Sequence, residues 1–156
     1  MPDESTELPS DLKRYELVDG VLTLTPTALS PHQRSVGALF LLMQRARQPG
    51  LHVVLSVRGP QPDLRIVEGD GLEPVVLAVE VLTKSSASED QIRKRARYAT
   101  DGVPHFWVFD PSEPTFTAYS LRNGVYFETH RATGEEITEV RHPIPIRICP
   151  AEITGP

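Results

Sequence analysis

VVLAVEVL, residues 75–82, is the stretch of sequence that decides the fold. It is apolar throughout except for one carboxylate, Glu80. A continuous apolar run of this length is typical of a central strand covered on both faces, whereas a strand with one wet face alternates apolar and polar residues. The stretch therefore predicts a sheet buried between two layers, and it raises the question of what neutralises Glu80.

Helix signals stand on both sides of this strand. Before it, residues 30–50 predict a helix that begins at an N-cap serine, Ser30, and stops at a Pro-Gly pair. After it, residues 85–102 predict a second helix, in which Ser86 and Glu89 have the spacing of a capping box. Its expected inward stripe consists of Ile92, Ala96 and Ala99.

Further strands are expected around this unit, separated by Gly and Pro clusters. Asp19-Gly20 and Asn123-Gly124 suit the tight turns of two hairpins, one near each end of the chain. The proline-rich C-terminal part allows one irregular edge strand. The remaining strand candidates are residues 51–57, 62–68 and 105–110.

These elements predict an α/β (α+β) fold, with a mixed β-sheet core, flanking helices and additional hairpins. We expect a flexible N-terminal tail over residues 1–11, a single domain over residues 12–149, and a C-terminal tail over residues 150–156. A chain of 156 residues falls in the range for one such domain.

Charge and cysteine content exclude several classes of protein. The net charge of −5 argues against a protein that coats nucleic acid nonspecifically, although a local basic patch remains possible. Cys149 is the single cysteine, so neither an intrachain disulfide nor a thiolate zinc site is expected. The acidic N-terminus does not read as a secretory signal, and no stretch is apolar enough to span a membrane. We expect a cytoplasmic protein.

Two carboxylates carry the strongest chemical signal. Asp63 opens one expected strand, and Glu80 lies near the end of the next. If these strands are neighbours, both side chains converge on one end of the sheet, where burying an uncompensated charge would be costly. Oxygen ligands of this kind suit Mg²⁺ or Mn²⁺, which could polarise a phosphodiester. Asp63 and Glu80 are therefore candidate metal ligands.

A cation is also needed to orient a nucleophile and to stabilise negative charge. The position two residues after the glutamate is Leu82, so no lysine stands there. Lys94 is the better substitute, because it shares a helix face with Asp90 and Tyr98. Lys84 is nearer in sequence but is expected in the loop after the strand, and it ranks second.

Six motifs in order carry a resemblance to a known family. The segments YELVDG, SPHQR, PDLRIV and VVLAVEVLTKSS are followed by Asp90 with Lys94 and Tyr98, and then by GVPHFWVFDP. Over residues 12–130 the chain resembles the Uma-two restriction endonucleases of the PD-(D/E)XK nuclease superfamily. The resemblance implies a restriction-endonuclease-like core and metal-dependent cleavage of phosphodiester bonds, with DNA as the expected nucleic-acid partner. It also implies an active site made of Glu16, Asp63, Glu80 and Lys94.

The chain departs from the family pattern at two places. Thr83-Lys84-Ser85 replaces the Ser-Pro-Ser that often follows the glutamate, which leaves open whether Lys94 or Lys84 serves the site. His105 replaces an acidic residue common in the GVPEYW box, at the start of a strand where it alters the surface more than the chemistry.

Structural roles compete with each of these assignments. Glu80 could pair with an arginine of the first helix, Asp63 could serve only as a turn or cap residue, and Glu16 could be a solvated strand residue. His32 could line the site or merely face solvent, and the second is preferred, while Lys94 could belong to a solvated charge run. Tyr98 and Trp107 are expected to be core aromatics.

Two other classes of protein remain open. The missing lysine after Glu80 and the acidic net charge would also fit a catalytically inactive module that binds nucleic acid or protein. Exposed hairpin edges would allow a homodimer in which the site is a relict.

Overall fold

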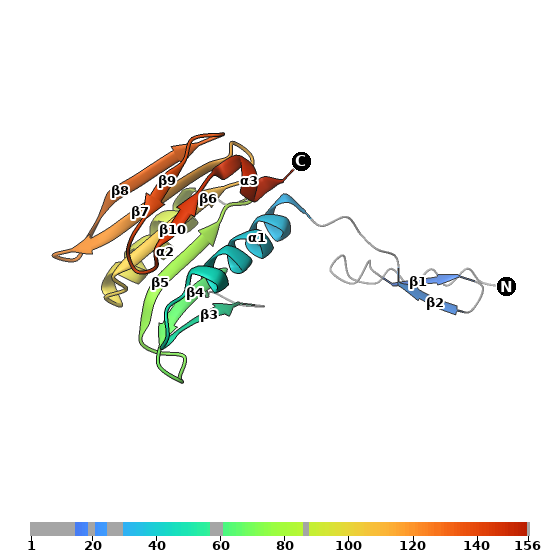
Figure 1. Cartoon of the computed structure of the whole chain (residues 1–156). Coiled ribbons are helices and arrows are strands. Elements are labelled where there is room, and N and C mark those ends of the chain that lie inside the picture. Colours follow the sequence, from blue (N-terminus) through green and yellow to red (C-terminus); the bar gives the residue numbers. More distant parts are fainter. Residues whose placement is uncertain (1–14, 19–20, 25–29, 57–60, 86–87, 156) are drawn as a thin grey trace.

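A six-stranded mixed sheet organises the computed structural model of the chain (Figure 1). Residues 30–56, 61–85 and 88–155 are described with their side chains, and residues 15–18 and 21–24 by their backbone. Neighbouring strands are antiparallel except for the parallel pair β5 and β6, which α2 (Ser88–Thr100) connects. This confirms the expected mixed sheet with flanking helices. In spatial order the strands are β3 (Leu51–Leu55), β4 (Leu64–Glu68), β5 (Val75–Val81), β6 (His105–Asp110), β7 (Thr115–Arg122) and β8 (Val125–Thr133).

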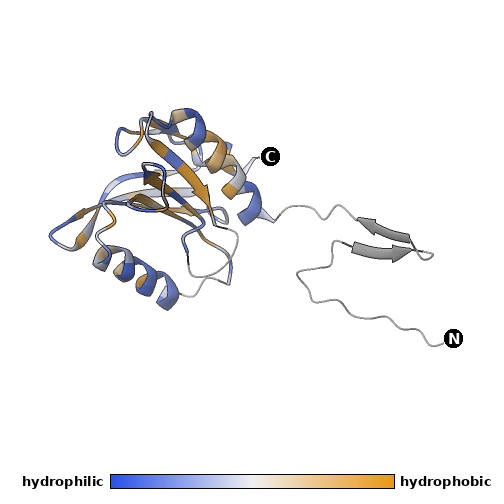
Figure 2. Cartoon of the chain, turned by 90° about the horizontal axis from the view of Figure 1, so that it is seen from below, coloured by the Kyte–Doolittle hydropathy of each residue, from blue (hydrophilic) through white to orange (hydrophobic). Residues whose placement is uncertain are grey.

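The central strand β5 is covered on both faces, as its apolar run predicts. Leu77, Val79 and Val81 belong to the larger core cluster, which includes residues of α1 (Pro31–Ala46). Ala78 belongs to a smaller cluster on the opposite face, together with residues of α2. Figure 2 shows the sheet between the two helices. Because side chains alternate along a strand, Glu80 lies on the α2 face.

The first helix follows its sequence signals closely. Ser30 is the N-cap, and its hydroxyl accepts a hydrogen bond from the backbone N–H of Gln33 at 3.1 Å. The Gln33 side chain accepts one in return from the Ser30 N–H, which completes a capping box. Leu39 and Met43 are fully buried on the inward face. The helix is therefore fixed both by its cap and by its apolar stripe.

The inward stripe expected for the second helix is wrong at Ile92 and Ala96, whereas Ala99 is half-buried against the smaller core cluster as expected. Ile92 is 68% exposed and Ala96 is also exposed, whereas Tyr98 is buried and Lys94 and Arg95 are half-buried. The reason is that this part of α2 covers a polar cleft and only a small apolar cluster, so polar contacts decide its rotation. Figure 2 shows the correspondingly hydrophilic character of α2. Ser86, of the expected capping box, lies outside the described residues.

The rotation of α2 gives a direct stability prediction. Ile92→Gln should change the free energy of unfolding by no more than about 0.5 kcal/mol, because the side chain is mostly in solvent. Leu39→Ala on the buried face of α1 should cost about 2 to 5 kcal/mol. Urea unfolding of the two variants measures this contrast. A loss at Ile92 as large as that at Leu39 would contradict the orientation of α2.

Both predicted hairpins are present. Asn123 and Gly124 have φ values of 51° and 76°, which are the positive angles that the turn between β7 and β8 requires. The strands β1 (Tyr15–Val18) and β2 (Val21–Leu24) pair antiparallel, while the turn residues Asp19 and Gly20 lie outside the described residues.

The C-terminal segment adds structure beyond the expected edge strand. β9 (Thr138–Val140) and β10 (Ile146–Ile148) form a separate two-stranded sheet. Residues expected as a C-terminal tail instead include a short helix, α3 (Pro150–Thr154), whose Ile153 is 2% exposed in the same core cluster as α1. Five residues are too few to show helical periodicity, so only the burial of Ile153 reveals this helix.

No helix among the described segments combines the length and the apolar character needed to cross a membrane.

Candidate active site

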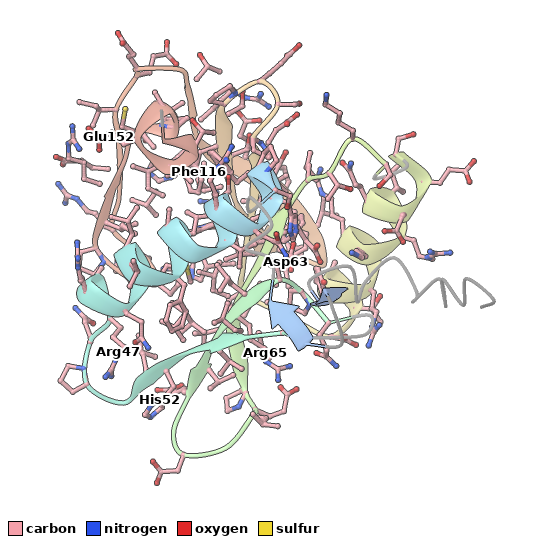
Figure 3. All side chains as sticks on the ribbon, turned by 90° about the vertical axis from the view of Figure 1, so that its right-hand side faces the viewer. Arg47, His52, Asp63, Arg65, Phe116 and Glu152 are labelled. Atoms are coloured by element: carbon pink, nitrogen blue, oxygen red, sulfur yellow. The ribbon has the colours of Figure 1, made fainter. Side chains whose placement is uncertain are left out.

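Asp63 and Glu80 converge at one end of the sheet, as predicted from their places in the sequence. Asp63 directly precedes β4, and Glu80 is the penultimate residue of the antiparallel neighbour β5. Both carboxylates line a cleft of about 410 Å³, which also receives side chains from α1 and α2. The label of Asp63 in Figure 3 marks its place between these two helices.

The carboxylate of Asp63 connects two further elements. Its Oδ2 accepts a hydrogen bond from the backbone N–H of Val81 at 2.8 Å, and its Oδ1 lies 3.2 Å from Nε2 of His32. The bond to Val81 is the kind of turn or cap contact considered for Asp63. The side chain nevertheless remains 25% exposed to the cleft, so it is open to a ligand as well.

Glu80 is almost completely buried and is held by two side chains of α2. Its Oε1 accepts a 2.5 Å hydrogen bond from the hydroxyl of Tyr98, and its Oε2 accepts one from Nζ of Lys94 at 3.2 Å. Its ion-pair partner among the described residues is therefore Lys94. The alternative of a purely structural ion pair had assigned this place to an arginine of the first helix. A lysine and a tyrosine therefore compensate the charge in the apolar strand.

Burial raises the pKa of Glu80, although the hydrogen bond from Tyr98 and the charge of Lys94 partly offset the effect. Burial likewise raises the pKa of the Tyr98 hydroxyl, and the hydrogen bond to Glu80 raises it further. Tyr98 consequently remains a protonated donor. It is buried, as expected of a core aromatic, but its hydroxyl belongs to the site.

Lys94 sits between two carboxylates. Its Nζ lies 3.2 Å from Glu80 and 3.6 Å from Asp90, which is one helical turn earlier on α2. Burial disfavours the ammonium, but the attraction of Glu80 and Asp90 outweighs it, and the pKa of Lys94 is raised. Lys94 is therefore positively charged at neutral pH. Lys84 is exposed in the loop after β5 and does not line the cleft.

His32 lines the site, the less favoured of the two positions that the sequence allowed for it. It lies in the first turn of α1, is 27% exposed, and lines the cleft. The hydrogen bond to Asp63 raises the pKa of His32 despite its partial burial. Its position in the first turn, two residues after the capping serine, was the available signal, but only the approach of α1 to β4 shows which side the imidazole takes.

The other residues discussed from the sequence are Glu16, Trp107 and His105. Glu16 lies on β1 opposite Thr23, and its side chain is outside the described part, so its role stays a prediction. Trp107 is 1% exposed and packs edge-on against Phe116, which confirms it as a core aromatic. His105 is half-buried at the start of β6, and it lines a different hollow from Asp63 and Glu80.

Asp63 and Glu80 are the residues that could hold Mg²⁺. Among the described residues no three His, Cys, Asp or Glu side chains are grouped closely enough to hold an ion, so the candidate ligands are this pair of carboxylates. Each of their four oxygens accepts one of the hydrogen bonds given above, and each carboxylate oxygen has about two lone pairs. Mg²⁺ is usually bound by one or two carboxylates with several retained waters, and the cleft has room for them at roughly 30 Å³ each.

Comparisons with known proteins identify the family of this α+β chain. Residues 2–149 match the family described as "Uma2: Putative restriction endonuclease", so the chain belongs to the Uma2 family, which supports a nuclease function. A solved structure, described as a "putative nuclease belonging to DUF820" from Anabaena variabilis, shares the fold. The two align with a TM-score of 0.59 at 15% identity, over 97% of this chain and 96% of the other. No curated protein matches the chain.

Proposed function

We propose that the chain is a divalent-metal-dependent nuclease that hydrolyses phosphodiester bonds in DNA. The convergence of Asp63, Glu80 and Lys94 from three elements on one open cleft carries the proposal. Asp63 and Glu80 would hold Mg²⁺ or Mn²⁺, with Glu16 as a further acid of the site. Family membership supports the nuclease class.

The bound ion would polarise the scissile phosphate and offset its developing negative charge. Lys94 supplies a fixed ammonium beside Glu80, where it can orient the attacking water and stabilise charge on the phosphate oxygens. Tyr98 holds the Glu80 carboxylate in one orientation through its hydroxyl. His32 and the Val81 N–H do the same for Asp63. The site is therefore preorganised by its own hydrogen bonds.

The catalytic lysine of this proposal has migrated from the strand to the helix. Leu82 occupies the strand position two residues after Glu80 and is half-buried. Lys94 instead reaches Glu80 from α2, one turn after Asp90 and one turn before Tyr98, so the ammonium arrives at the same carboxylate by another route.

DNA as the substrate is supported by charge beside the cleft. Residues 93–97 read RKRAR, and this run lies on the helix that forms one wall of the cleft. A local basic segment can attract phosphates even though the whole chain carries a net charge of −5.

Calorimetric titration with Mn²⁺ tests the metal site. The wild type should release or absorb heat with about one ion bound, and Asp63→Asn should lose that heat because a neutral amide replaces one of two charged ligands. Asp70→Asn, at an exposed aspartate of the turn between β4 and β5, is the matched control and should bind as the wild type does. Equal heats from the Asp63 variant and the wild type would remove the proposed site, and Mn²⁺-dependent DNA cleavage by the wild type completes the test.

A catalytically inactive binding module is the second candidate. It is favoured by the ion pair of Lys94 with Glu80, which compensates the buried charge without a metal. DNA binding that is unchanged in EDTA, with no Mn²⁺ heat and no cleavage, would support this candidate over the nuclease. The homodimer suggested by exposed hairpin edges stays a prediction.

A further inference from the structure

The cleft has two chemically different parts. One part is charged and contains the carboxylates of Asp63 and Glu80 and the ammonium of Lys94. The same cleft is lined by apolar and aromatic side chains on the α2 face of the sheet, from Phe106 and Val108 of β6 and Tyr119 of β7. Phe106 is 4% exposed and belongs to the smaller core cluster, whereas Tyr119 is half-buried, so Tyr119 is the ring of this part that a ligand could reach.

The guanidinium of an arginine lies over one ring of the aromatic part. The rings of Phe106 and Tyr119 are stacked, with centroids 5.9 Å apart and an interplanar angle of 23°. Arg95 of α2 continues this arrangement, because its Cζ lies 4.2 Å from the centroid of Tyr119. Its Nη2 also donates a hydrogen bond to the backbone carbonyl of Tyr126 at 3.2 Å, which fixes the guanidinium over the ring.

Arg95 forms no ion pair within 4.0 Å among the described residues. On α2, Arg93 pairs with Asp90, Lys94 with Glu80, and Arg97 with Asp101. Arg95 instead bonds a neutral carbonyl while lining the cleft. It therefore presents a planar, positively charged group in the same cleft as the carboxylates.

We propose that Arg95, whose guanidinium lies over the ring of Tyr119, is a binding platform for an unpaired nucleobase adjacent to the scissile phosphate. This inference rests on the proposed nuclease function and adds a substrate class, namely single-stranded or locally unpaired DNA. Unpaired bases are bound in proteins by stacking on aromatic rings and on arginine guanidinium planes, largely without regard to base identity. A base inside a duplex has both faces covered by its neighbours and could not occupy the platform.

A fluorescent mononucleotide tests the platform independently of cleavage. The probe is the 5′-monophosphate of 2-aminopurine deoxyribonucleoside, which has no phosphodiester to cleave and whose fluorescence is quenched on stacking. In Mg²⁺ the wild type should bind and quench it. Arg95→Lys keeps the charge but removes the planar group, and it should bind about tenfold more weakly with the quenching lost.

Arg97→Lys is the matched control, because Arg97 lies on the same helix, pairs with Asp101 and does not line this cleft. It should bind and quench as the wild type does. Arg95→Met serves as a second variant, and thermal unfolding of each variant checks its fold. Quenching by Arg95→Lys equal to that of the wild type would overturn the platform and leave Arg95 as a structural residue.

Cleavage separates the failure of the platform from the failure of the nuclease. Wild type should cleave a single-stranded oligonucleotide about tenfold faster than one with an abasic site beside the scissile bond, and Arg95→Lys should reduce that ratio to about one. Cleavage with an unchanged ratio in Arg95→Lys would refute the platform alone. Mononucleotide quenching without cleavage of any DNA would refute the nuclease and support a nucleotide-binding site.

Discussion

Glu80→Gln is expected to lower the rate of Mg²⁺-dependent DNA cleavage by about a thousandfold while leaving the fold intact. The amide retains the shape of the side chain and an oxygen that can still accept the hydrogen bond from Tyr98. It removes the negative charge that would hold the ion, and a bound ion contributes several kcal/mol of transition-state stabilisation, each 1.36 kcal/mol of which is tenfold in rate. Single-turnover cleavage of a labelled oligonucleotide measures the loss.

Glu68→Gln is the matched control for this variant. Glu68 ends β4, the strand next to β5, is exposed, and does not line the cleft, so its replacement should leave cleavage at the wild-type rate. Thermal unfolding of both variants verifies that they are folded. Cleavage by a folded Glu80→Gln protein at the wild-type rate would show that Glu80 is a structural residue, as the competing reading of the sequence has it.

Local sequence signals were sufficient for most of the fold. The apolar run around Glu80 predicts a strand covered on both faces because each of its residues must be buried on one side or the other. Asn123-Gly124 predicts a hairpin because few other residue pairs adopt two positive φ angles. Ser30 predicts the start of α1 because its hydroxyl satisfies a free N–H of the first turn. Each of these effects acts within a few residues, so sequence alone reveals it.

The rotation of α2 could not be predicted from hydrophobicity. Hydrophobicity places Ile92 inward, but the structure turns Lys94 and Tyr98 toward the sheet. One isoleucine and two alanines offer little apolar area, whereas a buried carboxylate without donors costs several kcal/mol. The helix therefore satisfies Glu80 rather than burying Ile92. The spacing of Asp90, Lys94 and Tyr98 had pointed to this face.

His32 shows a second limit of the sequence. It lies 31 residues before Asp63, and nothing in either local segment indicates that their side chains meet. The contact depends on how α1 crosses the sheet, which the buried Leu39 and Met43 determine through packing. The grouping of Asp63 with Glu80 was accessible because both lie at the ends of strands expected to be neighbours.

Lys94→Met is expected to lower cleavage by about a hundredfold, since removing one positioned donor from a transition-state site costs this much in well-studied enzymes. Methionine keeps much of the length of the side chain and removes the ammonium. Lys84→Met is the matched control, because Lys84 is exposed and outside the cleft, and it should cleave at the wild-type rate. The reverse result, with loss at Lys84 and none at Lys94, would move the catalytic lysine back to the loop after β5.

Metal binding distinguishes the role of Lys94 from that of Glu80. The ammonium and a divalent ion would both be attracted by the negative charge of Glu80, so removing the ammonium should leave Mn²⁺ binding at least as tight as in the wild type. Lys94→Met should thus show normal Mn²⁺ heat with slow cleavage, whereas Glu80→Gln should lose both. If Lys94→Met lost the Mn²⁺ heat as well, the lysine would be holding the carboxylate in place for the ion, and its effect on cleavage would be structural.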